Sequence, residues 1–289
     1  MDIEKVSFGL LGEKLGHSFS PKIFNAYFRR AGRGCAYGLF PVNPKKIKTF
    51  MEGLRSSFIR GLNVTIPYKE CMLSFLDEVS VDASRIGAVN VIRCSGAKID
   101  GYNTDFVGFM RVVKPLLNPD TEDLFAVVLG AGGAARAVIY ALHKLGVKDI
   151  LFFGRHLQKR YKILEDFSFI PLLRGEPWMD ERMRSGLKKA DLVVNATPLG
   201  MFPYADGSPL PPEFAVRPGT VAFDLIYNPF DTRFLVTFRR KGAAVENGWR
   251  MLVYQAVETL KLWNGGEIDE PLFFQAAEEV RNAAFFNSR

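Results

Sequence analysis

The sequence predicts an α/β protein of two domains, each built from parallel strands that alternate with helices. Two observations support this fold class. In the first third of the chain, apolar runs of strand length alternate with segments of helical spacing in a β-α-β-α-β series. From residue 125 a second series begins with an apolar run that breaks into glycines and resumes as a helix. A chain of 289 residues is long enough for two domains that each bury a core.

Composition narrows the class of protein before any motif is considered. Hydrophobic residues make up 48% and charged residues 24% of the sequence, which is typical of a soluble globular protein. No apolar run is long enough for a membrane span, and the first residues, Met1-Asp-Ile-Glu-Lys-Val6, lack the layout of a signal peptide. We therefore expect a cytoplasmic protein with no membrane partner.

The net charge of +7 would attract nucleic acid or another anion. Basic residues are spread through the chain apart from a cluster at 155–162, and an anionic small ligand explains the charge equally well. We expect no nucleic acid partner. Cys35, Cys71 and Cys94 lie far apart, and no histidine has the spacing of a metal ligand. We expect no bound metal.

The first domain is expected to contain three parallel strands joined by helices. In chain order these are a strand at 6–12, a helix from Pro21, a strand at 35–42, a helix at 44–54 and a strand at 59–66. Strands that alternate with helices pair in parallel through right-handed crossovers. A hairpin is expected next, with arms at 86–93 and 97–102 around Ser95-Gly96, and then a helix after Asp105.

Two serines stand beside the first helix, in the stretch Gly16-His-Ser-Phe-Ser-Pro21. Ser20 directly precedes Pro21 and is suited to an N-cap, whereas Ser18 has no such role. The alternative is that both hydroxyls donate hydrogen bonds to a ligand carboxylate near the helix N-terminus. The spacing by itself leaves both interpretations open.

Polar side chains also accompany the third strand and the hairpin. Asn63, Thr65 and Lys69 lie where the third strand ends, the edge at which open α/β sheets bind ligands. Thr104 and Asp105 follow the hairpin. The alternatives are an ordinary surface charge for the lysine and helix capping for Thr104 or Asp105.

The second domain is organised around residues 125–136, Phe-Ala-Val-Val-Leu-Gly-Ala-Gly-Gly-Ala-Ala-Arg. Gly130, Gly132 and Ala135 occupy the three small positions of the G-x-G-x-x-G/A fingerprint. They allow a sharp turn, close approach of a pyrophosphate to the backbone and close packing of the helix on the sheet. The stretch predicts a doubly wound, Rossmann-type domain that binds a dinucleotide at a helix N-terminus.

The end of the next strand, Asp149–Phe153, indicates which dinucleotide binds. NAD enzymes usually carry an acidic residue there, which binds the ribose 2′-hydroxyl. In this chain Gly154 and Arg155 follow the strand, and Glu165 is the first acid. These residues favour NADP and its 2′-phosphate. The alternative is a helix start whose basic residues are only solvated.

The remaining elements complete the second domain and return to the first. Strands are expected at 191–197 and 220–225, with an ordered loop at 203–218 between them and amphipathic helices at 248–263 and 272–284. A proline-bounded link at 115–119 is the expected boundary. We expect residues 1–115 plus 249–289 to form a substrate-binding and catalytic domain, and residues 116–248 to form an NADP-binding domain.

Seven short motifs, taken together and in this order, resemble those of the shikimate dehydrogenases of the aromatic amino-acid pathway. They are His17–Pro21, Asn63–Lys69, Gly87–Asn90, Asn103–Asp105, Gly130–Ala134, Asn195–Thr197 and Met251–Ala256. The resemblance runs through nearly the whole chain and is specific for the combination. It implies a reversible, NADP-dependent reduction of 3-dehydroshikimate to shikimate.

The resemblance also assigns residues to roles. It implies that Ser18 and Ser20 hold the substrate carboxylate and that Lys69 and Asp105 are the catalytic pair, which also contacts the substrate. The other residues implied around the ring hydroxyls are Thr65, Asn90, Tyr227 and Gln255. The residues implied for the cofactor are Gly130, Ala131, Gly132, Gly133, Ala134, Arg155, Lys159, Asn195, Ala196, Thr197 and Gly248, with Arg155 on the 2′-phosphate.

The sequence departs from the family pattern at three positions near Arg155. Gly154, His156 and Lys159 stand where Asn, Thr and Arg are common, and Lys in place of Arg loses a planar stacking group. We expect weaker NADP binding with the same charge preference. The alternatives are a quinate/shikimate dehydrogenase with broader substrate or NAD use and, outside enzymes, an inactive ligand-sensing or nucleic-acid-binding paralogue. A monomer and a homodimer are both compatible with the sequence.

Overall fold

The computed structural model describes residues 5–117 and 123–286, and these form two compact units. The first unit takes the chain up to Ser84, the segment Ala88–Thr104 and the chain from Ala256 on. The second unit takes Arg85–Gly87 and Asp105–Gln255. The α/β class with parallel sheets that the sequence predicts is confirmed in both.

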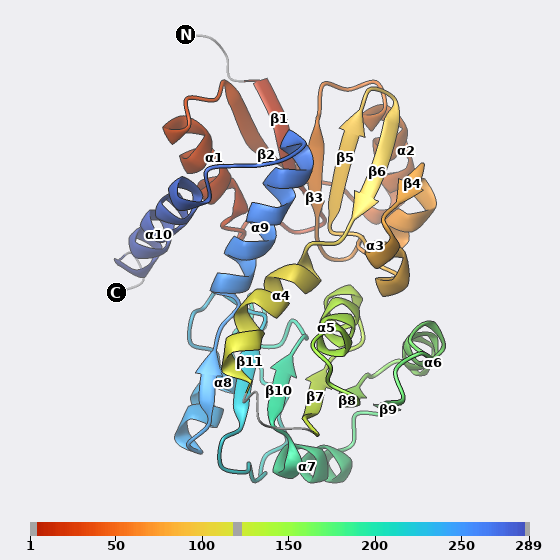
Figure 1. The fold of residues 1–289 in the computed structure, drawn as a ribbon, viewed down its shortest axis with the longest axis vertical. Helices are drawn as coiled ribbons and strands as arrows, with labels where there is room; N and C mark the ends of the chain where they lie inside the picture. Colours follow the sequence, from red (N-terminus) through yellow and green to blue (C-terminus); the bar gives the residue numbers. More distant parts are fainter. Residues whose placement is uncertain (1–4, 118–122, 287–289) are drawn as a thin grey trace. The chain divides into compact units, whose positions relative to one another are not determined.

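The first unit is a six-stranded sheet flanked by helices (Figure 1). Its strands are β1 (Lys5–Gly12), β2 (Cys35–Pro41), β3 (Gly61–Val64), β4 (Glu78–Val79), β5 (Val91–Ser95) and β6 (Lys98–Tyr102). Its helices are α1 (Ser20–Arg30), α2 (Ile47–Leu54), most of α3 (Val81–Ile86), the second half of α9 (Trp249–Asn264) and α10 (Glu270–Phe286). The strand order is β2-β1-β3-β5-β6-β4, in which β2, β1 and β3 are parallel and β5 is antiparallel to both neighbours.

The three parallel strands expected at the start of the chain are confirmed, but two element boundaries differ. The segment from Pro44 forms a 3-10 turn, and the α-helix begins only at Ile47. The first hairpin arm begins at Val91 and not at residue 86, because α3 occupies the preceding segment. Gly87 has a φ of +69°, a left-handed conformation that ends helices and that glycine adopts without strain.

Buried apolar side chains pack the helices of the first unit against its sheet. Leu62 of β3 and Met51 of α2 belong to one buried cluster, with 0% and 2% exposure. Trp263 of α9 stacks on Phe8 of β1 at 4.6 Å between ring centroids, and its indole Nε1 donates to Ile92 O of β5 at 2.9 Å. The second half of α9 is therefore locked against the sheet by packing and by one buried hydrogen bond.

The second unit contains a six-stranded sheet in which every strand is parallel to its neighbours. Its strands are β7 (Phe125–Leu129), β8 (Asp149–Phe153), β9 (Leu172–Glu176), β10 (Leu192–Asn195), β11 (Val221–Asp224) and β12 (Ala244–Glu246). Its helices are α4 (Asp105–Val113), α5 (Gly133–Lys144), α6 (Leu157–Asp166), α7 (Asp180–Lys189), α8 (Arg233–Arg240) and the first half of α9.

The strand order of this sheet, β12-β11-β10-β7-β8-β9, is that of a doubly wound fold. The chain starts at the central β7, builds outward through β8 and β9, and then returns to add β10, β11 and β12 on the other side. The winding reverses between β7 and β10, and open sheets of this kind bind ligands at such a switch point. The Rossmann-type prediction is confirmed. The sequence did not reveal β9, an edge strand whose half-exposed residues lack an apolar run.

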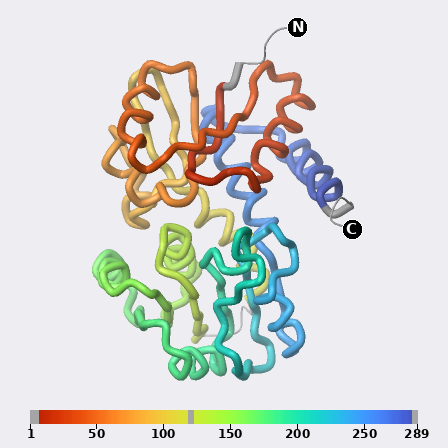
Figure 2. The backbone as a smooth tube through the Cα atoms, turned by 180° about the vertical axis from the view of Figure 1, so that it is seen from behind, coloured from red at the N-terminus to blue at the C-terminus, as the bar shows by residue number. Residues whose placement is uncertain are grey.

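The compact units and the domains expected from the sequence divide the chain at different residues. In the structure, α4 and the first half of α9 group with the doubly wound sheet, so the first unit ends at Thr104 and not near residue 115. Residues 118–119 of the expected boundary lie outside the described residues. In Figure 2 most of the second unit is the green, teal and light blue part of the tube. The assignment of substrate and cofactor to separate domains stays a prediction.

Candidate active site

One edge of the first sheet collects most of the predicted substrate residues. We call it the polar edge and define it as the edge where β1, β3 and β6 end and β5 begins. Asn63 lies opposite Val91, so the start of the antiparallel β5 lies beside the end of β3. Val91 also lies opposite Tyr102, which brings the end of β6 to the same edge. The predicted residues that follow or precede these strand ends are Ser18, Ser20, Thr65, Lys69 and Asn90.

The two serines have different roles in the structure. Helix α1 begins at Ser20 with Phe19 at the N-cap position and no side-chain cap, so the capping interpretation of Ser20 is wrong. Instead, Ser18 Oγ accepts a hydrogen bond from the backbone N–H of Ser20 at 3.2 Å. Ser20 is 6% exposed, and its hydroxyl has no hydrogen-bond partner among the described residues. The Ser20 hydroxyl is therefore not used by the fold, whereas Ser18 also shapes the helix entry.

The loop that carries Lys69 is tied to the sheet on both sides. The backbone N–H of Thr65 donates to Leu11 O of β1 at 2.9 Å, and that of Tyr68 donates to Thr65 O at 2.9 Å. Lys69 O accepts from the backbone N–H of Val89 at 2.7 Å. Lys69 itself is half-buried. The backbone of Lys69 is thus held directly against the loop that leads into β5.

Asn90 connects this loop to the end of β6. It is 3% exposed, and its Nδ2 donates to Thr104 Oγ1 at 3.1 Å while its Oδ1 accepts from the Thr104 backbone N–H at 2.7 Å. The Asn90 backbone N–H also donates to Tyr102 O at 3.0 Å. Asn63 Nδ2 donates to Asn90 O at 3.5 Å. The amide of Asn90 therefore fixes where the chain leaves β6, one residue before Asp105.

Asp105 and Gln255 belong to the second unit and lie on adjacent helices there. Asp105 is the first residue of α4, and both residues are 7% exposed. Helix α4 passes so close to α9 that a Cβ added at Gly108 would lie 2.8 Å from Met251 O and 3.0 Å from Gln255 Cβ. Asp105 lies one turn before Gly108 on the same helix face. Lys69 belongs to the first unit, so its pairing with Asp105 stays a prediction.

All predicted cofactor residues lie at one edge of the second sheet, where its parallel strands end. They are Gly130–Ala134 after β7, Arg155 and Lys159 after β8, Asn195–Thr197 at the end of β10 and Gly248 after β12, with Tyr227 after β11. Because the sheet is fully parallel, the carboxyl ends of these strands share one edge. The cofactor motif and the predicted substrate residue Tyr227 are thus brought to the same edge.

The glycine turn after β7 has the features that phosphate binding requires. Gly130 has a φ of +128°, its N–H donates to Phe153 O at 2.8 Å, and an added Cβ would lie 2.8 Å from Ala196 O. Helix α5 begins after Gly132 with no side-chain cap and no acid in its first turn. Its first N–H groups are therefore available to an anion, which the helix dipole also favours.

Two arginines after β8 differ in what they do. Arg155 is exposed and makes no hydrogen bond or ion pair with the described residues. Arg160 is 9% exposed, and its Nη1 donates to Gly154 O at 2.7 Å, so it holds the end of the strand. Lys159 is exposed as well. Of these basic side chains, only that of Arg155 is both exposed and without a partner among the described residues, and no acid ends β8.

The side chain of Asn195 is used by the protein itself. Asn195 is fully buried; its Oδ1 accepts from the backbone N–H of Thr197 at 3.0 Å and from the Thr197 hydroxyl at 2.7 Å. Its Nδ2 donates to Asp224 Oδ1 at 3.0 Å and to Leu199 O at 3.2 Å. Asn195 therefore shapes the turn together with Thr197, whose Oγ1 also accepts from the Leu199 N–H at 3.2 Å.

Asp224 is a buried residue that the sequence reasoning missed. It ends β11 at 0% exposure and accepts hydrogen bonds from Thr232 Oγ1 at 2.6 Å and from the Ile226 N–H at 3.0 Å, besides Asn195. Burial raises the pKa of Asp224 to about 7, against the opposing effect of these donors. Its one sequence signal is an acid at the end of a buried strand. Asp224 joins the Asn195 turn to the segment that carries Tyr227.

Tyr227 and Gly248 lie on neighbouring segments. The Gly248 N–H donates to Ile226 O at 3.0 Å, one residue before Tyr227. Gly248 also directly precedes Trp249, the first residue of α9. The start of the helix that carries Gln255 is thus fixed to the end of β11.

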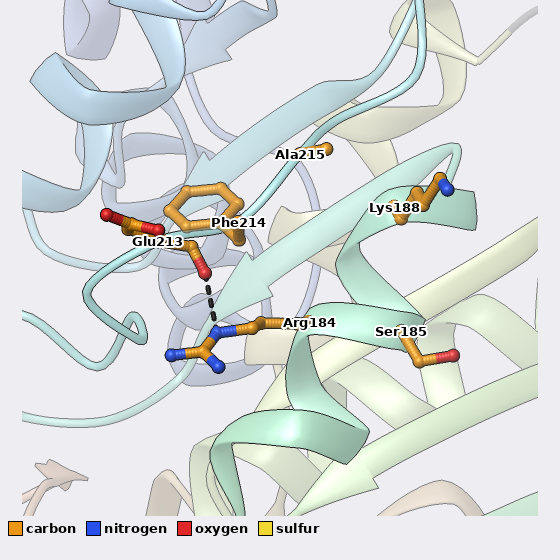
Figure 3. Close-up of a pocket in the computed structure, with 6 residues that line it drawn as sticks. All are labelled: Arg184, Ser185, Lys188, Glu213, Phe214 and Ala215. Atoms are coloured by element: carbon orange, nitrogen blue, oxygen red, sulfur yellow. Dashed lines mark hydrogen bonds between the residues drawn. The ribbon is translucent and has the colours of Figure 1, made fainter.

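The structure has a shallow pocket in the second unit that contains none of the predicted residues. It is lined by Arg184, Ser185 and Lys188 of α7 and by Glu213, Phe214 and Ala215 (Figure 3), with Arg184 Nε donating to Glu213 O at 2.7 Å. Helix α7 ends just before β10 begins, so the pocket lies toward the amino ends of the strands, away from the edge described above. Residues 5–117 and 123–286 contain no group of three or more potential metal ligands and no helix long and apolar enough to cross a membrane.

These sites together indicate a class of protein. A doubly wound sheet binds dinucleotides at its switch point, and the uncapped α5 begins there. The polar edge of the first unit provides hydroxyls, amides and a lysine, which are the donors that a hydroxylated carboxylic acid requires. The class is a dinucleotide-dependent oxidoreductase.

Comparison with known proteins narrows this class to one family. Residues 10–92 match the family model described as the shikimate dehydrogenase substrate binding domain. The shikimate dehydrogenase (NADP(+)) of Methanothermobacter thermautotrophicus is 36% identical over 274 residues, which cover 95% of this chain and 96% of that protein. The chain belongs to the shikimate dehydrogenase family.

Solved structures agree with this membership. The shikimate 5-dehydrogenase of Thermus thermophilus, in complex with NADP(H) and shikimate, has a TM-score of 0.79 and 34% identity, and the match covers 95% of this chain and 99% of that one. The shikimate 5-dehydrogenase of Listeria monocytogenes, in complex with shikimate and NAD, has a TM-score of 0.81 and 27% identity over 95% of this chain and 97% of that one. Both similarities extend through both units.

Proposed function

We propose that this chain is a shikimate dehydrogenase that interconverts 3-dehydroshikimate and shikimate with NADP. The observation that carries the proposal is the placement of the motif residues at two sheet edges. Ser18, Ser20, Thr65, Lys69 and Asn90 gather at the polar edge of the first sheet, although they come from three separate segments of the chain. The cofactor motifs gather at the carboxyl edge of the second. A chance resemblance of short motifs would not give this arrangement.

The residues at the second edge fit NADP. The α5 N–H groups after Gly132 would hold the pyrophosphate, since no side chain caps them. Arg155 would hold the 2′-phosphate, since it is exposed and has no partner among the described residues, and Gly154 leaves the end of β8 without a competing acid. When bound, NADP supplies or accepts the hydride of the reaction.

Lys69 and Asp105 are the groups that we expect to move the proton. Oxidation of a secondary alcohol removes a hydride from carbon and a proton from oxygen, and the proton needs a positioned base. Two bonds support the pairing: Lys69 O accepts from Val89 N–H, and Asn90 accepts from the N–H of Thr104, each at 2.7 Å. Lys69 is therefore bonded to Val89, and Thr104, which precedes Asp105, is bonded to the next residue, Asn90.

Substrate binding is assigned to the remaining residues of the polar edge and to two residues of the second unit. The Ser20 hydroxyl, which the fold leaves without a partner among the described residues, is suited to donate to the substrate carboxylate beside the α1 N-terminus. Thr65 and Asn90 are suited to the ring hydroxyls, together with Tyr227 and Gln255. We expect the enzyme to be cytoplasmic and either a monomer or a homodimer.

A spectrophotometric assay with four pairings tests this function. The purified chain is incubated with shikimate or quinate and with NADP or NAD, and the absorbance of the reduced nicotinamide is followed. We expect the highest kcat/KM for shikimate with NADP. Comparable turnover of quinate, or a preference for NAD, would instead identify the broader quinate/shikimate type.

The control is the Lys69→Ala variant, purified by the same procedure. Because an expression host can contain an enzyme of the same activity, turnover that survives in the variant would be attributed to contamination. Absence of turnover in all four pairings with the unchanged chain would contradict the proposed function. Salt-sensitive retention of DNA by such an inactive chain would then favour the nucleic-acid-binding alternative.

A further inference from the structure

A buried hydroxyl in α9 connects segments of the first unit that are far apart in sequence. Thr259 has 0% exposure, and its Oγ1 accepts a hydrogen bond from Asn63 Nδ2 at 3.2 Å. Thr259 Oγ1 also lies 3.3 Å from Thr104 Oγ1, at hydrogen-bonding distance. Asn63 is held in turn by Tyr37, whose hydroxyl donates to Asn63 Oδ1 at 2.9 Å. The hydroxyl of Thr259 thus joins β3, the end of β6 and α9.

Each partner in this network lies next to a proposed substrate residue. Asn63 is two residues before Thr65, on the same strand end. Thr104 directly precedes Asp105 and is bonded twice to Asn90. Thr259 follows Gln255 by four residues on one continuous helix, which places both on the same face of α9. One hydroxyl is therefore adjacent, through at most one helical turn of chain, to four of the proposed substrate residues.

Packing alone does not require a hydroxyl at this position. A valine has nearly the same shape as threonine and would fill the same space without a polar group to satisfy. The hydroxyl adds a geometric constraint on its partners, because hydrogen bonds weaken steeply when distance or angle changes. A buried and connected polar network of this kind specifies one arrangement of the segments that it joins.

We propose that Thr259 is a positioning residue of the substrate site, which sets the placement of the segments carrying Thr65 and Asn90 in the first unit. This inference rests on the proposed function and deepens it. Thr259 does not need to contact the substrate for this role. Its hydroxyl holds Asn63 and Thr104, and these residues hold the backbone on which the substrate groups are mounted.

The test compares Thr259→Val with Thr259→Ser. The valine variant keeps the volume and removes the hydroxyl, whereas the serine variant keeps the hydroxyl. We expect kcat/KM for shikimate to fall roughly 10- to 100-fold in Thr259→Val, as expected for small misplacements of reacting groups, while KM for NADP stays unchanged. Thr259→Ser should recover most of the loss. Should Thr259→Val not fold, Thr259→Cys replaces it, because the volume of cysteine is close to that of threonine and its thiol forms only weak hydrogen bonds.

Thr220→Val is the matched control for loss of a buried threonine hydroxyl. Thr220 also has 0% exposure, and its Oγ1 lies within hydrogen-bonding distance of two acceptors, Ala190 O at 2.9 Å and Arg217 O at 2.8 Å. It lies just before β11 begins, at the amino end of that strand. Thr220→Val is expected to lower the melting temperature and to leave kcat/KM for shikimate unchanged in the folded enzyme.

The outcomes separate this inference from the proposed function. Normal kcat/KM for shikimate in Thr259→Val, alongside an active unchanged enzyme, would overturn the inference alone. Equal losses of activity in Thr259→Val and Thr220→Val would overturn it as well, because they would reflect destabilisation only. No turnover in the unchanged enzyme would overturn the proposed function and this inference with it.

Discussion

We expect the choice of cofactor to depend on Arg155, and replacing Arg155 by alanine measures that dependence directly. In the structure Arg155 is exposed and has no partner among the described residues, so its removal breaks no internal interaction. A guanidinium can hold a 2′-phosphate through two charge-assisted hydrogen bonds, each stronger than a neutral one. The loss should be roughly 1.4–3 kcal/mol of binding free energy, or about 10- to 100-fold in affinity. Exposure to solvent places the expectation at the lower end of this range.

The assay measures KM for NADP and for NAD in the unchanged enzyme and in Arg155→Ala. We expect KM for NADP to rise by the factor above and KM for NAD to change little, because NAD has no 2′-phosphate. The melting temperature should remain the same. The ratio of the two KM values therefore isolates the contribution of Arg155 to discrimination.

Arg160→Ala is the matched control, since it removes the same kind of side chain from the same segment. Arg160 is buried and donates to Gly154 O at 2.7 Å, so its loss leaves that carbonyl without this donor. We expect a loss of stability of about 1–3 kcal/mol and similar effects on both cofactors. If Arg155→Ala also weakened NADP and NAD equally, Arg155 would support the loop and not the phosphate, and the reasoning from its exposure would be refuted.

The roles of four other residues lead to three more measurements. Lys69→Ala and Asp105→Asn should each lower kcat by about 10²–10⁴-fold with little change in KM, and the double variant should lose little more, because the two are proposed to act as a unit; additive losses in the double variant would contradict the pairing. Ser18→Ala should raise KM for shikimate about tenfold or more, whereas a lower melting temperature at unchanged KM would show that its bond to the α1 backbone is its main role. Asp224→Asn should remove a pH dependence of stability. Burial raises the pKa of Asp224 to about 7, above its ordinary value of 3.8, so between these values the folded protein binds a proton that the unfolded chain releases. The free energy of unfolding of the unchanged protein should therefore fall as pH rises toward 7 relative to the variant, and parallel curves of melting temperature against pH would contradict this.

Local patterns in the sequence were sufficient to predict the glycine turn and the parallel strands. The turn after β7 depends on residues close to one another in the chain: Gly130 adopts a φ of +128°, and α5 begins at Gly133. Buried parallel strands read as continuous apolar runs, because both faces of the sheet are covered. An edge strand such as β9 is half exposed and gave no such run.

Gly154 stands where the family pattern commonly has asparagine, and the tertiary contacts around it explain why a small residue fits there. A Cβ added there would lie 2.7 Å from Ala131 Cβ and 3.0 Å from Arg160 Cγ. The glycine turn and the buried arginine therefore leave little room for a larger residue. From the sequence, Gly154 indicated only that the acid of NAD enzymes and the asparagine of the family pattern are both absent.

Short motifs and apolar periodicity were enough to establish the family, the fold class and the types of residue available for catalysis and binding. Which polar groups the protein uses for itself could be seen only in the folded chain. Ser18, Asn195 and Arg160 hold backbone or neighbouring side chains in place, while the Ser20 hydroxyl and the Arg155 side chain have no partner among the described residues. Asp224 and Thr259 became visible only through partners 29 and 196 residues away in the chain. A hydrogen bond depends on distance and angle in space, and folding brings together groups whose separation along the chain carries no information about either.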